Sequence, residues 1–193
     1  KEVYNYQDYF NSSKQNKILS EINMVINTIG SSNQESDLAE VNYEIPKKII
    51  DSLIKFIELN KRQIYWIQLS SLSVYGGPSR KINQINENSP LKIENNYSLS
   101  KSKIDKYLLQ IESKYFKKII LRPGAIVAKN MKNNSLRELI NIIKKKYFFY
   151  ISDSADSYLH YIFVDDLINT IFTIYESDKK NLNNIYILTN NIL

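Results

Sequence analysis

The sequence predicts an α/β fold in which helices flank a parallel sheet. Two observations support this class. Short apolar runs rich in β-branched and aromatic residues recur along the chain, and the stretches between them carry apolar residues three or four positions apart. Such alternation of strands and helices is typical of parallel sheets with right-handed crossovers. A chain of 193 residues, 43% of them hydrophobic, is long enough for one domain with a substantial core.

Short apolar stretches are predicted as strands or extended segments at residues 22–27, 64–69, 118–121, 160–164 and 185–188. The clearest of these is Ile64–Leu69, which is rich in β-branched and aromatic residues and ends at the hydroxyls of Ser70 and Ser71. A buried strand of this kind brings side chains to a site at its C-terminal end. We therefore expect site residues directly after it.

Helical periodicity predicts helices over residues 40–59, 97–115, 136–146 and 165–175, while residues 1–20 are polar with a weakly helical second half. Pro46 lies inside the first of these helices. Because proline is tolerated in the first turn but not in the interior, the helix either spans the whole stretch or begins at Pro46.

Composition narrows the classes of site and partner. The chain has no cysteine and one histidine, so neither a disulfide framework nor a histidine-based metal site is expected. The net charge of +6 suits an anionic ligand such as a dinucleotide, although solvated lysines explain it equally well. No apolar run approaches the length of a membrane span, and no nucleic-acid partner is expected. A cytoplasmic location fits these features.

One pair of polar residues occupies the apolar face of the second predicted helix. Tyr97 and Lys101 are four positions apart, so a helix places them on the same face, one turn apart. Ile104, Leu108 and Ile111 continue that face and would pack it against the sheet. A tyrosine and a lysine with this spacing form a weak signal alone, because any lysine-rich helix produces it by chance.

The order of motifs around this pair is similar to that of the extended short-chain dehydrogenase/reductases, which are NAD-dependent nucleotide-sugar epimerases, dehydratases and reductases. The motifs are Ser71 followed by VYGG, an ENSP loop, Tyr97-x-x-x-Lys101, a strand ending in LRPG, and the run FVDDL. The resemblance covers roughly residues 22–188. It implies a Rossmann-like parallel sheet, NAD or NADP as the cofactor, and a nucleotide sugar as the substrate.

The resemblance also implies a role for each site residue. Tyr97 would act as the acid or base, Lys101 would lower the pKa of that phenol and hold the cofactor ribose, and Ser71 would orient the reacting oxygen. Ser73 is the alternative to Ser71, since both would lie on the same side of an extended chain. Tyr75 either lines the substrate site or is a buried structural residue.

The cofactor contacts follow from the same resemblance. Thr28, Ile29 and Gly30 resemble the segment that passes under the cofactor in the family, and Pro123 lies in the turn near the nicotinamide. The full set of expected cofactor-binding residues is Thr28, Ile29, Gly30, Ser70, Tyr97, Lys101 and Pro123. Arg122, directly before this turn, is interpreted as structural.

One expected motif is missing from the sequence. Dinucleotide-binding folds place a glycine-rich turn under the pyrophosphate, but the four glycines of this chain do not form G-x-x-G-x-x-G. We therefore expect a single partial domain over residues 1–193, without its first βαβ unit and the end of its substrate region. The substrate segments present would be residues 76–96 and 124–160. These residues alone are expected to bind NAD weakly or not at all.

The stretch that ends in FVDDL also resembles epimerases and reductases of surface polysaccharide synthesis, and this resemblance implies a 4-epimerase or a 4-keto reductase. A dehydratase is less favoured, because SSLSVYG lacks a Thr-Asp-Glu group. The alternative is a non-catalytic Rossmann-like binding or assembly protein, or a degenerate fragment, and the leucine at Leu159, where the family often has arginine, supports it. A homodimer through the helix carrying Tyr97 and the helix before it is a further expectation.

Overall fold

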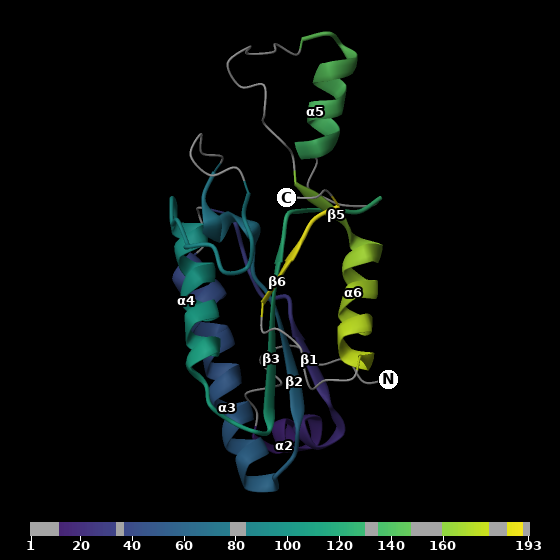
Figure 1. The fold of residues 1–193 in the computed structure, drawn as a ribbon. Coiled ribbons are helices and arrows are strands. Elements are labelled where there is room, and N and C mark those ends of the chain that lie inside the picture. The colour runs from purple at the N-terminus through teal and green to yellow at the C-terminus, as the bar shows by residue number, and fades with distance from the viewer. Residues whose placement is uncertain are drawn as a thin grey trace.

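The computed structural model describes residues 12–33, 37–77, 84–129, 135–147, 160–177 and 185–190. Its main sheet has four parallel strands in the order β1-β2-β3-β6, as Figure 1 shows. The strands are β1 (Met24–Asn27), β2 (Ile64–Leu69), β3 (Phe116–Pro123) and β6 (Ile185–Leu188). The predicted fold class is therefore confirmed. The carboxyl ends of β2 and β3 lie beside each other, since Leu69 pairs with Leu121.

Helices cover both faces of this sheet. Figure 1 shows α3 (Ile45–Asn60) and α4 (Asn96–Gln110) on one face and α6 (Val164–Glu176) on the other. The remaining helices are α2 (Ser12–Glu21) and α5 (Ser135–Lys144). No helix in the described part of the chain combines the length and the apolar character that crossing a bilayer requires.

A second, smaller sheet was not predicted. Strands β4 (Ala125–Val127) and β5 (Tyr161–Phe163) pair in parallel. β5 lies within the extended stretch predicted at residues 160–164, whereas β4 was not predicted, because three residues are too few for a periodic pattern to show. Gly124 joins β3 to β4. A Cβ atom at this position would lie 2.5 Å from the His160 carbonyl oxygen, so the close approach of two backbone segments requires glycine here.

The stretch before Pro46 reconciles the two alternatives for the first long helix. Residues Glu40–Glu44 form a π-helical turn, η1, that runs directly into α3, with Pro46 in the first turn. The backbone N–H of Ile45 donates to the Glu40 carbonyl, five residues back. The wider turn accommodates a proline, which has no N–H to donate and whose ring would clash in a regular helix.

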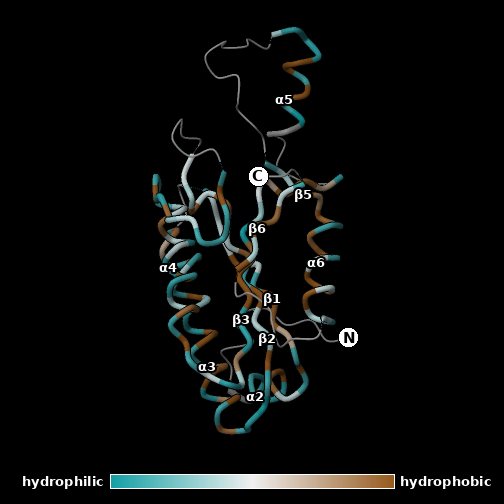
Figure 2. The backbone as a smooth tube through the Cα atoms, in the orientation of Figure 1, coloured by the Kyte–Doolittle hydropathy of each residue, from teal (hydrophilic) through white to brown (hydrophobic). Residues whose placement is uncertain are grey.

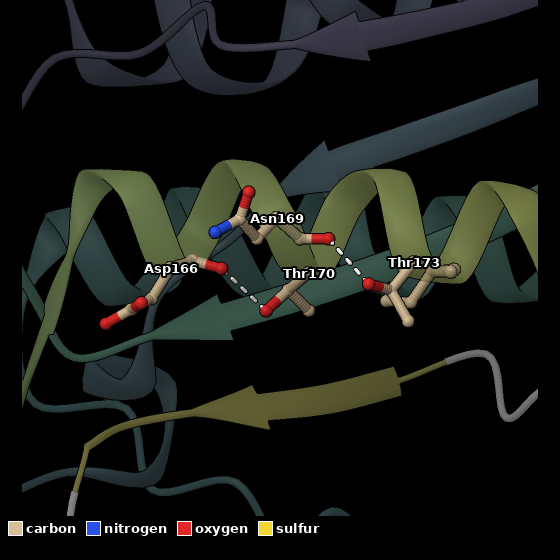
Figure 3. Close-up of a pocket in the computed structure, with 5 residues that line it drawn as sticks. Asp166, Asn169, Thr170 and Thr173 are labelled. Carbon is tan, nitrogen blue, oxygen red and sulfur yellow. Dashed lines mark hydrogen bonds between the residues drawn. The ribbon is translucent and has the colours of Figure 1, made fainter.

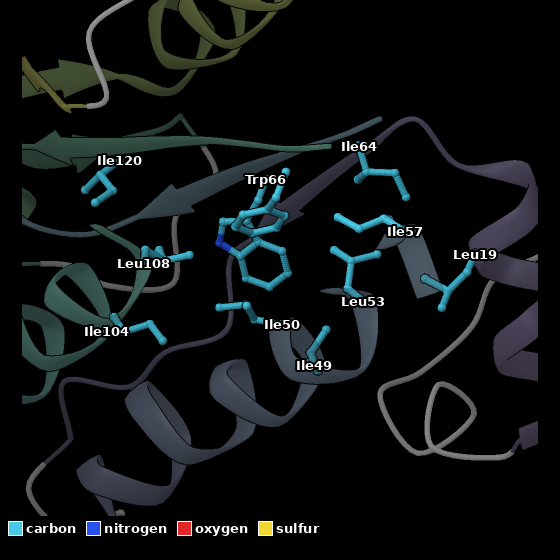
Figure 4. Packing of buried hydrophobic residues seen from close by; sticks show 11 residues of the cluster. Leu19, Ile49, Ile50, Leu53, Ile57, Ile64, Trp66, Ile104, Leu108 and Ile120 are labelled. Carbon is cyan, nitrogen blue, oxygen red and sulfur yellow. The ribbon is translucent and has the colours of Figure 1, made fainter. Parts of the chain in front are cut away.

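The core is divided between the two faces of the sheet, and the brown segments of Figure 2 mark the apolar runs that build it. Between the sheet and helices α3 and α4, Trp66 of β2 is fully buried at the centre of the cluster drawn in Figure 4. On the opposite face, Ile67 of β2 packs in a cluster that includes Leu167 and Ile171 of α6. Consecutive residues of β2 thus point to opposite faces of the sheet. The cluster around Trp66 packs α4 against one of these faces.

Candidate active site

The site begins where β2 ends. Ser70 is 5% exposed, and its backbone N–H donates to the Leu121 carbonyl of β3 at 2.8 Å. Ser71 follows in extended conformation and caps a short 3-10 helix, η2 (Leu72–Tyr75), by accepting the Ser73 N–H at 3.1 Å. The hydroxyls of Ser70 and Ser71 therefore stand at the carboxyl edge of a parallel sheet, where ligands bind in open α/β sheets.

The start of α4 supplies the second half of the site. A capping box closes its first turn: Asn95 accepts the Ser98 N–H at 2.8 Å, and Ser98 accepts the Asn95 N–H at 3.2 Å. This cap sets Tyr97 in the first turn and Lys101 one turn later. Asn42 of η1, which is fully buried, braces the same turn by donating to the Ser100 hydroxyl at 2.9 Å.

Three side chains of α4 meet three consecutive residues at the end of β2. The Lys101 ammonium donates to the Leu69 carbonyl at 3.2 Å, and the Ser70 hydroxyl donates to Asp105 at 2.8 Å. The Ser71 hydroxyl lies close enough to the Tyr97 phenol to lower its pKa. The α4 residues are spaced by four, so one stripe of the helix lies along the strand end. The structure thus brings Ser71, Tyr97 and Lys101 together.

The electrostatics of the pair differ from the expectation. Burial raises the pKa of Tyr97, and the Ser71 hydroxyl offsets part of that rise. Lys101 stands over the tyrosine ring, with its Nζ atom 5.9 Å from the ring centroid. Burial lowers the pKa of Lys101, and the charge of Asp105 opposes this. A lowered pKa at Tyr97 is therefore not a property of these residues by themselves.

Arg122 of β3, Asp105 of α4 and Tyr75, the last residue of η2, form a buried network. Arg122 donates to Asp105 through Nε at 3.1 Å and through Nη2 at 3.0 Å, and to the Tyr75 hydroxyl through Nη1 at 2.6 Å. Tyr75 is 3% exposed, and its hydroxyl donates to the Glu87 carbonyl. The geometry favours the structural alternative for Tyr75 over substrate contact, and it agrees with a structural Arg122.

The reason given for Ser73 as an alternative to Ser71 is wrong. Ser73 lies inside the 3-10 helix η2, so the two serines do not share one side of an extended chain. The Ser73 hydroxyl oxygen is buried and has no hydrogen-bond partner among the described residues, whereas the Ser71 hydroxyl reaches Tyr97. Of the two, Ser71 has the geometry that the expected role requires.

The expected cofactor segment after β1 approaches Lys101 closely. A Cβ atom at Gly30 would lie 2.7 Å from the Lys101 Nζ atom and 3.1 Å from Oδ1 of Asn42. Thr28 is exposed, while Ile29 is partly buried and packs against the core. Pro123 is buried at the end of β3, where it pairs with Leu188. Of the expected cofactor residues, Gly30 and Lys101 are thus directly adjacent.

A cavity of about 900 Å³ lies beside Tyr97. The residues that line it come from the chain before η1 and from the start of α4: Ser32, Asp37, Leu38, Ala39, Asn95, Asn96, Tyr97, Leu99, Ser100 and Lys103. Its volume falls in the range of small-molecule sites. Polar side chains at its wall suit a polar ligand.

A second hollow lies on α6, on the opposite face of the sheet from α4 (Figure 1). Figure 3 shows its lining side chains along one helix, with Thr170 donating to the Asp166 carbonyl and Thr173 to the Asn169 carbonyl, each at 2.8 Å. These hydroxyls bond their own helix, and we do not assign the hollow to the site. The described residues contain no acidic or histidine cluster that could hold a metal ion.

A profile of the NAD dependent epimerase/dehydratase family matches residues 4–188. The chain belongs to this family. A search of curated protein sequences returns no match. The family assignment confirms the resemblance drawn from the motifs around Ser71, Tyr97 and Lys101. Leu159, where the family often has arginine, lies outside the described residues.

Solved structures of low sequence identity share the fold. A UDP-glucuronic acid 4-epimerase from Bacillus cereus, solved with NAD, has a TM-score of 0.67 at 16% identity over 91% of this chain and 55% of its own. A dTDP-glucose 4,6-dehydratase from Bacillus anthracis, also solved with NAD, has a TM-score of 0.68 at 17% identity, over 94% of this chain and 56% of its own. A dTDP-4-dehydrorhamnose reductase ortholog from Clostridium acetobutylicum has a TM-score of 0.66 at 18% identity, over 93% of this chain and 60% of its own. The chain therefore spans 55–60% of the length of these proteins.

Sequence reasoning missed Asp105. The available signal was its spacing, because it continues the four-residue interval of Tyr97 and Lys101 on a face that is otherwise apolar. An acidic residue on a buried helix face needs a positively charged or hydrogen-bonding partner, and Arg122 of the LRPG strand was a candidate in the sequence. Pairing the two would have required knowing that β3 lies beside β2.

Proposed function

We propose that the chain carries the catalytic residues of an NAD(P)-dependent oxidoreductase or epimerase that acts on a nucleotide sugar, as a 4-epimerase or a 4-keto reductase in surface polysaccharide synthesis. The observation that carries the proposal is the meeting of Ser71, Tyr97 and Lys101 at the carboxyl end of β2, beside a cavity. The family assignment and the three similar folds support the reaction class. An epimerase, a dehydratase and a reductase share this fold, so the fold by itself does not select the reaction.

The residues present fit the nicotinamide and ribose end of the cofactor. An ammonium has three donors, and Lys101 uses one of them within the described part of the chain, on the Leu69 carbonyl. Gly30 has no side chain to block the approach to Lys101 Nζ. When bound, the cofactor supplies or accepts a hydride. The glycine-rich turn that would hold the pyrophosphate has no counterpart in this sequence.

In this proposal each residue of the chain has one task. Tyr97 donates a proton to the reacting sugar oxygen or accepts one from it, and Ser71 orients that oxygen through its hydroxyl. Lys101 holds the ribose hydroxyls and places a positive charge near the phenol. Burial raises the pKa of Tyr97, so the phenol is the stable form in this structure and proton donation needs no prior change.

The test combines binding with turnover. Calorimetry with NAD⁺, NADH, NADP⁺ and NADPH is run on this chain and, where its reading frame is longer, on the whole gene product. The form that binds is then assayed with a panel of UDP- and dTDP-sugars. We expect Tyr97→Phe to bind cofactor like the parent and to lose turnover by at least about a hundredfold, the contribution typical of a general acid or base. Cofactor binding by neither form would favour the non-catalytic alternative.

A further inference from the structure

We propose that Asp105 is a positioning residue of the candidate active site, which holds Ser70 at the end of β2 and sets the electrostatic environment of the Lys101 ammonium. The contacts belong to the chain itself. Only their catalytic consequence rests on the proposed function.

The geometry around Asp105 is rigid. Its carboxylate is fully buried, and one oxygen, Oδ2, accepts three hydrogen bonds, from the Ser70 hydroxyl at 2.8 Å and from the Arg122 Nε and Nη2 atoms at 3.1 and 3.0 Å. Because Ser70 is also bonded through its backbone to Leu121, the strand end is held between α4 and β3. Ser71 is the next residue, so its hydroxyl is positioned by the same contacts.

The other oxygen, Oδ1, is buried and makes no hydrogen bond within the described residues. Asp105 lies one helical turn beyond Lys101 on the same face of α4, and the two side chains interact electrostatically. In a buried environment such an interaction is much stronger than in water. The negative charge of Asp105 is therefore available to the lysine amine rather than being confined to the pair with Arg122.

The surroundings of Lys101 offer few other charges. Tyr97 and Asp105 are the titratable groups beside it on α4, and Arg122 of β3 lies beyond Asp105. The segment after β1 contributes Gly30, and η1 contributes the neutral side chain of Asn42. Burial lowers the pKa of Lys101, and among the described residues the charge of Asp105 opposes that shift. The loss of that charge should therefore make the amine easier to deprotonate.

The test is a carbon-13 NMR titration of the lysine Cε signals, with the Lys101 signal assigned by its absence from Lys101→Arg. We expect Asp105→Asn to shift the Lys101 midpoint to lower pH and Asp105→Glu to restore it toward the parent. Asp105→Asn leaves the Arg122 guanidinium buried without its anion. The double variant Asp105→Asn/Arg122→Gln removes that unpaired charge as well, and its Lys101 midpoint should also move to lower pH. The matched control is Asp51→Asn on α3, which removes a partly buried carboxylate that is paired with Lys47 and bonded by the Tyr107 hydroxyl, and it should leave the Lys101 midpoint unchanged.

The sign of the shift separates positioning from a merely structural role. If Asp105 only stabilises the fold, its loss loosens the packing, Lys101 gains solvent, and the midpoint moves to higher pH. That result, or an unchanged midpoint, would overturn the inference. The titration needs no cofactor and no turnover. A downward shift without cofactor binding would therefore contradict the proposed function and leave the role of Asp105 standing.

Discussion

Arg122→Met tests the buried network most directly. Methionine has a similar length and no charge, so it removes the guanidinium while filling much of its volume. The side chains of Arg122 and Asp105 are 3% and 1% exposed. Removing one partner of such a pair leaves the other charge buried and costs about 3–5 kcal/mol of unfolding free energy. Small domains have about 5–15 kcal/mol in total, so the loss should be plain.

The loss should also depend on pH. Burial raises the pKa of Asp105, and Arg122 opposes that rise, so the arginine-free variant has a higher pKa still. A carboxyl whose folded pKa lies above its unfolded value contributes stability at low pH and loses it as pH rises through the folded pKa. The deficit of Arg122→Met should therefore be small near about pH 4, the ordinary carboxyl range, and larger near neutral pH.

Urea unfolding followed by tryptophan fluorescence measures both effects, because Trp66 is the single tryptophan and is fully buried. A loss below about 1 kcal/mol, the value of exposed pairs, or a loss that is the same at both pH values would refute the reasoning. Arg122→Met/Asp105→Leu should recover most of the loss, because an apolar pair replaces a buried ionic one. Lys47→Met, which breaks a pair with Asp51 that is about one third exposed, should change stability much less than Arg122→Met.

Two further predictions concern close approaches and buried charge. Gly124→Ala should lower the unfolding free energy by about 1–3 kcal/mol in thermal melts, because its Cβ would press on the His160 backbone. A Cβ at Gly30 would meet side-chain atoms rather than backbone, Lys101 Nζ at 2.7 Å and Asn42 Oδ1 at 3.1 Å, so Gly30→Ala should displace the amine and lower the melting temperature less than Gly124→Ala does; equal losses for both variants would contradict this contrast. Lys101→Met removes an amine whose pKa burial lowers. Between that pKa and the ordinary lysine value of about 10.4, the unfolded parent chain binds more protons than the folded one, so the unfolding free energy of the parent should rise with pH relative to that of Lys101→Met. Urea unfolding at several pH values measures this difference. A difference in unfolding free energy that does not change with pH would contradict the prediction.

The expected homodimer stays a prediction. An exposed apolar stripe on residues 40–59 would have supported it, but Ile49, Ile50, Leu53 and Ile57 are buried in the core. Leu59 is the one large hydrophobic residue of that helix that is prominently exposed.

Much of the fold was readable because it depends on local pattern. Strands β2 and β6 have the predicted bounds, since a short β-branched run between polar residues marks its own ends. The end of α4 was not readable. Apolar spacing predicted a helix to Tyr115, whereas α4 ends at Gln110, and Lys118 of β3 donates to the Leu109 carbonyl at 3.1 Å. A side chain of the next strand thus satisfies the helix end, and helical periodicity does not encode that contact.

The same division holds in the site. The sequence by itself determined the strand end with its serines, the helix face shared by Tyr97 and Lys101, and the family. Tertiary structure decided that Asp105 joins this face to Arg122, that Tyr75 is buried, and that burial raises the pKa of Tyr97. The physical reason is that periodicity is a property of neighbouring residues. Burial and charge pairing depend instead on which elements the fold places side by side.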